Sequence, residues 1–307
     1  MTRRGRDRPG GAPARTSAPR WSEWRGLPTA WSPSADVLRE TLDGGQSFRW
    51  HHDGAGSWTG TWAGCVAQLR LGIEGLEWRA PLVVAARTEA ELPRYLALDD
   101  DWAARADALP LRVDEHLAAC VREFGGLRLL RQPFGEVLLG FLCSSSKRIV
   151  QIKQMLGMLA ERHGAEIAPG HSRLPTWPEL AGVSEAELRL CRLGFRARYV
   201  RDTAQFLASQ PDWLGRVERL PYADAKAALL DLPGVGEKVA DCVLLFGAGR
   251  AEAFPVDTWI LKSLARRYRL DGWKPAQLAA FGRKHFGPGA GLAQQYLFAW
   301  ERRFGGR

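Results

Sequence analysis

Lys238 and Asp257 are the two residues of this sequence whose surroundings best suit covalent chemistry. Lys238 follows the turn-forming stretch L-P-G-V-G and falls in the first turn of an expected helix. The N-terminus of a helix carries partial positive charge and disfavours another, so part of this lysine population can be the neutral amine, which is a nucleophile. Asp257 precedes another expected helix, where its carboxylate could stabilise a positive charge that develops on a sugar.

The turn before Lys238 is suited to contact phosphate. Gly234 and Gly236 lack side chains, which lets the backbone approach a ligand closely. The helix that follows points its first backbone N–H groups toward a bound anion. We therefore expect Gly234, Val235 and Gly236 to lie against the backbone of a nucleic acid.

Spacing alone leaves a purely structural interpretation open at each of these positions. Cys242 and Phe246 lie four and eight residues after Lys238, so all three share one helix face. That face could line a pocket, or it could be the buried face of an ordinary amphipathic helix. Asp257 could be an N-cap, although capping does not exclude catalysis because a carboxylate held by such bonds stays ionised.

The composition is that of a folded protein that favours a polyanionic partner. The 307 residues are 46% hydrophobic and 25% charged, and this length allows two domains with separate cores. The net charge of +9 favours nucleic acid as a partner. The first twenty residues contribute +5 of this charge, so the remainder is mildly basic.

The cysteines and histidines predict neither disulfides nor a metal site. The five cysteines are widely spaced, form no C-x-x-C pair and are typical of buried thiols in a reducing compartment. The six histidines are scattered, apart from the adjacent His51 and His52. We expect no metal and no cofactor, and no apolar run approaches the roughly 20 residues of a membrane span.

Hydrophobic periodicity predicts an α+β protein with three regions. Residues 1–20 are expected to be a disordered basic tail, with an organelle transit peptide as the alternative. Residues 21–120 are expected to form an N-terminal antiparallel sheet domain with helices, including one from about Glu89 to Ala108. Residues 121–307 are expected to form an all-helical domain that contains the turn before Lys238.

The segment Leu232–Asp257 resembles the helix-hairpin-helix motif with a Gly/Pro-rich loop and an aspartate, the signature of a superfamily of DNA glycosylases. Further segments narrow the resemblance to the 8-oxoguanine DNA glycosylase family and follow in that family's order. They are Gly45–Trp50, Leu129–Phe134, Phe141–Ser145, Leu193–Val200 and Ala293–Phe298. The resemblance covers the chain from about Trp21 to the C-terminus.

The resemblance implies a reaction and assigns its two central residues. Lys238 matches the family's Schiff-base lysine and Asp257 its aspartate. A damaged base would flip out of the duplex, Lys238 would attack the sugar C1′ and Asp257 would stabilise the cationic transition state. The resulting imine would acidify the C2′ hydrogen and permit β-elimination of the 3′ phosphate.

The resemblance also implies a pocket for the flipped base. Gly45 matches the glycine whose carbonyl accepts the N7 hydrogen of 8-oxoguanine, a hydrogen that guanine lacks. Cys242 and Phe298 match the residues that sandwich the base. Gln294 matches the residue that binds its Watson–Crick edge, and Pro255 matches another wall.

The chain departs from the family pattern where the opposite strand would be contacted. Ser146, Lys147 and Arg148 stand where the family has asparagines. Three further substitutions are Gln151 for an arginine, Phe195 for the tyrosine that wedges the duplex, and Trp259 for a histidine that touches phosphate, whereas the cytosine-reading Arg196 is kept. We therefore expect an intact lesion pocket and a weaker or differently built discrimination for the cytosine opposite the lesion.

The resemblance thus implies a bifunctional DNA glycosylase and AP lyase for oxidised purines, with double-stranded DNA containing oxidised guanine as its partner. A related glycosylase for another damaged base is one alternative. A helix-hairpin-helix protein that binds DNA without catalysis is the other, although phosphate binding requires neither Lys238 nor Asp257. We expect a monomer inside the cell, in the cytoplasm or nucleoid of a bacterium or the nucleus of a eukaryote.

Overall fold

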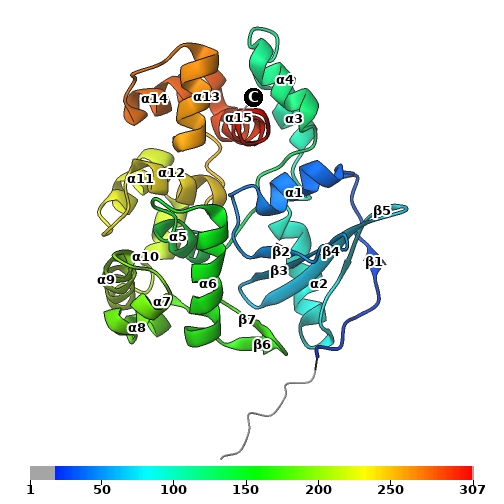
Figure 1. Ribbon diagram of the computed structural model, residues 1–307, viewed down its shortest axis with the longest axis vertical. Coiled ribbons are helices and arrows are strands. Elements are labelled where there is room, and N and C mark those ends of the chain that lie inside the picture. The colour runs from blue at the N-terminus through cyan, green and yellow to red at the C-terminus, as the bar shows by residue number, and fades with distance from the viewer. Residues whose placement is uncertain (1–17, 306–307) are drawn as a thin grey trace, which may run out of the picture.

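The computed structural model describes residues 18–305, so most of the predicted tail at 1–20 lies outside the described residues. The described chain has the predicted α+β architecture, with an N-terminal sheet followed by many helices (Figure 1). The sheet is antiparallel and has the strand order β1-β5-β4-β3-β2. Its strands are β1 (Arg25–Gly26), β2 (Trp50–His52), β3 (Ser57–Trp62), β4 (Cys65–Gly72) and β5 (Gly75–Arg79).

One face of this sheet buries large aromatic side chains. Trp58 and Trp62 alternate with Gly60 along β3, and Trp50 pairs with Gly60 across the β2–β3 ladder. The Trp50 and Trp62 rings stack with centroids 5.9 Å apart. The Tyr95 hydroxyl of α2 (Ala85–Tyr95) accepts a hydrogen bond of 3.1 Å from the Trp50 indole. This satisfied donor allows the ring to be fully buried.

Helix α1 (Ala35–Asp43) lies between β1 and β2 and has no predicted counterpart. Ser34 caps the helix by accepting a hydrogen bond from the backbone N–H of Val37. Val37 packs in the helical core, while Leu38 and Leu42 pack in the sheet core. The buried residues of α1 lie on one face, so the sequence carries a helical period here that the sheet prediction missed.

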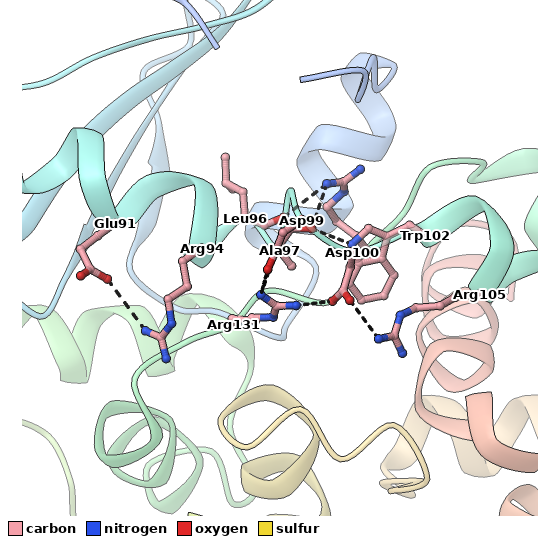
Figure 2. A network of polar contacts seen from close by, with 10 residues as sticks. Glu91, Arg94, Leu96, Ala97, Asp99, Asp100, Trp102, Arg105 and Arg131 are labelled. Carbon is pink, nitrogen blue, oxygen red and sulfur yellow. Dashed lines mark hydrogen bonds and ion pairs between the residues drawn. The ribbon is translucent and has the colours of Figure 1, made fainter. Parts of the chain in front are cut away.

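The single helix expected from Glu89 to Ala108 is also wrong, because the chain breaks into α2 and α3 (Trp102–Asp107). Ala97 has a left-handed φ of 49°, which ends the first helix, and Asp101 caps the second. Arg131 pairs with Asp99 at 2.6 Å and with Asp100 at 2.7 Å, as Figure 2 shows. These long-range pairs stabilise the break and are not visible in local periodicity.

The remaining described chain is mainly helical, as predicted. The helices with predicted counterparts are α4 (Glu115–Glu123), α5 (Phe134–Leu142), α6 (Ile149–His163), α8 (Glu185–Leu190), α9 (Arg196–Ser209), α11 (Tyr222–Leu230), α12 (Glu237–Phe246), α13 (Thr258–Tyr268), α14 (Pro275–Phe286) and α15 (Ala290–Phe304). Elements that we did not predict are α7 (Trp177–Ala181), α10 (Trp213–Arg219), the short 3₁₀ turns Leu82–Val84 and Gly287–Gly289, and the hairpin of β6 (Glu166–Ala168) and β7 (His171–Ser172). The unpredicted elements are short, so their periodic signal is weak.

Two hydrophobic cores meet around α1. The sheet core joins the tryptophans to α2, and the helical core joins α4 through α15. In Figure 1, α1 lies beside α15, which is the last helix of the chain. The loop after α1 is thereby brought next to the C-terminal helix, although the two are about 250 residues apart in sequence.

We expect Gly60→Ala to destabilise the sheet core. A Cβ at Gly60 would lie 2.4 Å from the Trp50 ring, which is itself enclosed and cannot move away. The free energy of unfolding should fall by about 1–3 kcal/mol, the usual cost of overpacking a core. Gly26→Ala in β1 is the control, because nothing lies within 4 Å of its Cβ position. Denaturant unfolding of both variants measures the difference, and equal stabilities would contradict this packing.

Candidate active site

Helix α12 carries the predicted lysine at its start and follows α11 across the hairpin Leu232–Gly236. Gly234 has a left-handed φ of 80°, and a Cβ there would lie 2.4 Å from the Tyr199 ring. Gly234 and Gly236 are exposed, whereas the Val235 side chain is buried. The hairpin therefore presents glycine backbone to solvent and is held to the core by Val235.

The Lys238 amine lies among residues of α5 and the loop that follows it. Its Nζ is 3.2 Å from Oγ of Ser144 and 4.9 Å from the centroid of the Phe141 ring. The Ser144 hydroxyl donates to the Phe141 carbonyl at 2.7 Å, so its lone pairs are free to accept from Lys238. These contacts hold the Lys238 amine beside Ser144 and the Phe141 ring. Both residues belong to the segment Phe141–Ser145, which carries the family resemblance, but neither was predicted to contact Lys238.

Asp257 is an N-cap, as one of the two interpretations of its position predicted. Its Oδ1 accepts hydrogen bonds from the backbone N–H of Trp259 at 3.0 Å and of Ile260 at 2.9 Å. Burial raises the pKa of Asp257 above its ordinary value, while these bonds and the charge of Lys238 act in the opposite direction. The two capping bonds therefore favour the ionised carboxylate, as expected, while burial opposes it.

One cavity of about 490 Å³ brings together both predicted catalytic residues and all the predicted base-binding residues. They are Gly45, Lys238, Cys242, Pro255, Asp257, Gln294 and Phe298, and Trp259 also lines the cavity. Phe246 lines it too, so the shared face of α12 forms a wall. A larger hollow of about 860 Å³ lies along α6 and contains neither Lys238 nor Asp257.

Gly45 and Phe298 form two walls of this cavity that approach each other closely. Gly45 has a left-handed φ of 98°, and a Cβ there would lie 3.3 Å from Cζ of Phe298. The next residue, Gln46, is buried and holds the loop: its amide nitrogen donates to the Arg128 carbonyl at 2.9 Å, and its oxygen accepts from the Leu130 N–H at 2.8 Å. A side chain at position 45 would therefore narrow the cavity.

The Gln294 amide is already hydrogen-bonded within the protein. Its nitrogen donates to the Pro255 carbonyl at 3.2 Å, and its oxygen accepts from Gln295 at 2.7 Å. Both glutamines are buried, so these bonds satisfy groups that would otherwise be costly to enclose. Cys242 is also buried, and this raises the pKa of its thiol to about 12, which makes it a neutral wall rather than a second nucleophile.

Ser146, Gln151, Phe195 and Arg196 were predicted to contact the opposite strand and lie outside this cavity, and two of them bind the protein itself. The Gln151 side chain accepts a hydrogen bond of 3.1 Å from the backbone N–H of Arg148 and so caps α6. The buried Arg196 guanidinium donates to the Leu193 carbonyl at 3.2 Å and to the Ser145 carbonyl. Ser146 is exposed, with a left-handed φ of 54°, and Phe195 is 54% exposed.

The cavity is also lined by lysines and arginines that were not predicted to belong to the base pocket. Lys147 and Arg148 come from the loop before α6, Lys262 from α13 and Arg302 from α15. The Lys262 amine lies 5.0 Å from the Trp259 ring centroid. This set gives the cavity a positive rim, which suits a ligand carrying phosphates. The spacing of Lys262 from Trp259 was the signal that could have identified it.

Comparison with known proteins shows the family to which this chain belongs. The family described as "8-oxoguanine DNA glycosylase, N-terminal domain" matches residues 32–138. N-glycosylase/DNA lyase OGG1 of Arabidopsis thaliana is 32% identical over 314 residues, covering 94% of this chain and 82% of that protein. This chain belongs to the 8-oxoguanine DNA glycosylase/lyase family.

Solved structures of this family share the fold. The 8-oxoguanine glycosylase/lyase of Clostridium acetobutylicum, in complex with double-stranded DNA containing cytosine opposite 8-oxoguanine, has a TM-score of 0.80 and 30% identity. The match covers 87% of this chain and 91% of that one. A 3-methyladenine DNA glycosylase from Archaeoglobus fulgidus has a TM-score of 0.70 at 18% identity, covers 91% of this chain and 98% of that one, and shares the fold.

Three further findings concern residues 18–305. No group of three or more histidine, cysteine or acidic side chains in that range is arranged to hold a metal ion. No helix in the same range combines the length and the apolar character needed to cross a membrane. All five cysteines are free and buried, in agreement with the sequence-based prediction.

We expect Asp257→Asn to stabilise the fold at neutral pH. The asparagine oxygen can still cap α13, whereas the charge, whose burial raises the pKa of Asp257, is removed. A raised folded-state pKa makes ionisation cost stability, and this cost vanishes as pH falls below the ordinary carboxyl pKa of about 4. The variant should therefore have the higher Tm at pH 7, and the gap should close toward pH 4.

The matched control is Asp101→Asn, at the exposed N-cap of α3, where the same cap is kept without burial. This variant should show no such pH-dependent gain in Tm. A lower Tm for Asp257→Asn than for the wild type at pH 7 would contradict burial as the dominant influence on the carboxylate.

Proposed function

We propose that this protein excises 8-oxoguanine from duplex DNA and then cleaves the strand by an AP lyase step, with Lys238 as nucleophile and Asp257 as the stabilising carboxylate. The observation that carries the proposal is the single cavity that joins Lys238 and Asp257 to Gly45 and Phe298. The cavity is suited to a flipped base, because its walls combine aromatic, sulfur and amide groups.

In the first step the Lys238 amine forms a bond to C1′ while the bond from C1′ to the base breaks. The departing base takes the bonding electrons and a proton. Positive charge develops on the sugar, and the enclosed Asp257 carboxylate stabilises it. The C1′–O4′ bond of the sugar then breaks, O4′ takes a proton from water, and a protonated imine remains between Lys238 and C1′.

The second step breaks the DNA strand. The imine withdraws electrons from C2′, so a base removes a C2′ proton and the 3′ phosphate leaves with the C3′–O electrons. Water then hydrolyses the imine and returns Lys238. These steps need neither a redox cofactor nor a metal ion.

Selectivity for the oxidised base rests on one hydrogen. The backbone carbonyl of Gly45 accepts the N7 hydrogen of 8-oxoguanine, whereas guanine presents a second acceptor there. An unmatched buried acceptor costs about 1–3 kcal/mol, so the pocket should bind guanine moderately more weakly than 8-oxoguanine. Cys242 and Phe298 contact the two faces of the base, Gln294 binds its Watson–Crick edge, and Pro255 closes the pocket.

The remaining predicted contacts are made with the DNA backbone and the opposite strand. Gly234, Val235, Gly236 and Trp259 lie against phosphates, and the exposed Phe195 wedges the duplex. The protein acts as a monomer inside the cell. The two domains divide near residue 120, and the flipped base enters where the loop after α1 meets the helical domain.

Borohydride trapping tests the nucleophile. We expect the wild type to form a covalent complex with DNA containing 8-oxoguanine, and Lys238→Gln to form none, because amide nitrogen cannot attack C1′. Lys284→Gln on α14 is the control, since that lysine is exposed and lies outside the cavity. Asp257→Asn should lower the excision rate by at least about a hundredfold, as loss of a preorganised charge does elsewhere.

The same assay separates the alternatives. A panel of duplexes with different damaged bases would reveal another preferred substrate. A protein that binds all the duplexes but never crosslinks to them would be a DNA-binding module. Retained crosslinking by Lys238→Gln would contradict the proposed nucleophile.

We also infer that discrimination for the cytosine opposite the lesion is weak. Gln151 and Arg196, which occupy the positions of the family's reading arginines, are hydrogen-bonded to backbone groups of this chain. Ser146 offers a short hydroxyl where the family has an asparagine amide. Lys147 and Arg148 contribute charge at the same loop and suit phosphate rather than a base edge.

Excision rates on 8-oxoguanine opposite each of the four bases test this inference. We expect the four rates to fall within about tenfold, which corresponds to less than about 1.4 kcal/mol of discrimination. Arg196→Ala should slow all four alike, because the side chain holds the loop through the Ser145 carbonyl. A strong preference for cytosine that Ser146→Ala or Arg196→Ala abolishes would contradict weak discrimination for the opposite base.

A further inference from the structure

Two ion pairs connect α1 of the sheet domain to α15, the C-terminal helix. Arg302 Nη1 lies 3.0 Å from Glu40 Oε2, and Arg303 Nη1 lies 2.8 Å from Asp36 Oδ2. Asp36 and Glu40 are one turn apart on α1, and the two arginines are neighbours in the last turn of α15. The pairs therefore join the same two helices at adjacent places.

The two pairs differ in burial. The Arg302 and Glu40 side chains are 27% and 14% exposed, whereas those of Arg303 and Asp36 are 39% and 40% exposed. Water and salt screen the outer pair more strongly than the inner one. Burial raises the pKa of Glu40, and the charge of Arg302 opposes that rise. The inner pair is thus the one able to constrain its surroundings.

The inner pair lies beside the two segments that carry the close walls of the base cavity, Gly45 and Phe298. Arg302 lines the cavity, and its Cζ is 5.5 Å from the centroid of the Phe298 ring. On the other side, a Cβ at Gly44 would lie 3.0 Å from Oε2 of Glu40, so this carboxylate lies against the loop that carries Gly45. Arg302 therefore contacts the stacking ring, and Glu40 contacts the loop that would read the lesion.

We propose that Arg302 and Glu40 are a positioning pair that sets the separation of Gly45 and Phe298 and so determines how tightly a flipped oxidised base is bound. This inference rests on the proposed function. The cation–π contact restrains the Phe298 ring from one face, and the ion pair ties that restraint to the loop after α1. When the Phe298 ring and the Gly45 carbonyl are already in place, less conformational entropy is lost as the base enters.

The pair acts on binding more than on chemistry, because the charge of Arg302 is a smaller influence on the pKa of Asp257 than burial, the capping bonds or Lys238. Arg302 contacts Phe298, which would stack on the base, rather than the reacting amine. Loss of Arg302 should weaken binding of the substrate and transition state together, which raises the half-saturating DNA concentration and leaves the maximal rate nearly unchanged. A residue with a general structural role would instead lower Tm and raise the half-saturating concentration equally on every duplex, including one that carries an abasic site.

Single-turnover excision of 8-oxoguanine at increasing protein concentration measures both quantities. We expect Arg302→Met to raise the half-saturating concentration about tenfold and to change the maximal rate less than about threefold. Arg302→Lys should recover part of the loss, because it keeps a cation near Phe298 and Glu40. Glu40→Gln should weaken binding in the same direction, with its amide still able to fill the site.

Arg303→Met is the matched control, since it breaks the outer pair between the same helices and lies outside the cavity. Its half-saturating concentration should stay within about twofold of the wild type. A duplex with an abasic site is the second control: it has no base to place, so the Arg302→Met defect should shrink there. Circular dichroism and Tm confirm that each variant is folded.

The outcomes separate this inference from the function on which it rests. Equal effects of Arg302→Met and Arg303→Met, or a half-saturating concentration unchanged by Arg302→Met, would overturn the positioning role while the wild type remains an active glycosylase. A loss of maximal rate without a change in half-saturation would also overturn it. A wild type that leaves 8-oxoguanine in place would overturn both proposals.

Discussion

Asp257 accepts two backbone hydrogen bonds at the N-terminus of α13, and this fixes a carboxylate in the cavity that also holds Lys238. Enclosing a charge is costly, and the raised pKa of Asp257 reflects that cost. The helix N-terminus and the Lys238 amine compensate part of it. The fold therefore maintains a charge that would be more stable in water, in the place where the proposed reaction develops the opposite charge.

The other cavity residues come from segments far apart in the chain, and each needs its own support. Gln46 holds the Gly45 loop through two backbone groups, and Gln294 is satisfied by Pro255 and Gln295. These bonds limit the freedom of the walls before any base arrives. The cavity is preorganised in this sense, which reduces the ordering cost of binding.

The opposite-strand region is built differently. Gln151 and Arg196 satisfy backbone groups around the loop before α6 instead of facing solvent. A guanidinium that supports a loop has to exchange partners before it can read a base. The family resemblance is therefore strong in the lesion pocket and weaker where the partner strand would lie, although the loop before α6 borders both regions.

Local sequence determined what depends on short-range physics. The start of α12 after two glycines, the Asp257 cap and the shared face of Lys238, Cys242 and Phe246 all follow from helix geometry. Family motifs added the residues of the base pocket, which share the 490 Å³ cavity. The helical period of α1 was present and was missed, whereas local pattern failed between α2 and α3 because the distant Arg131 stabilises that break. Tertiary structure alone brought Ser144 to Lys238 and Glu40 to Arg302, since contacts between residues 94 and 262 positions apart leave no trace in local spacing.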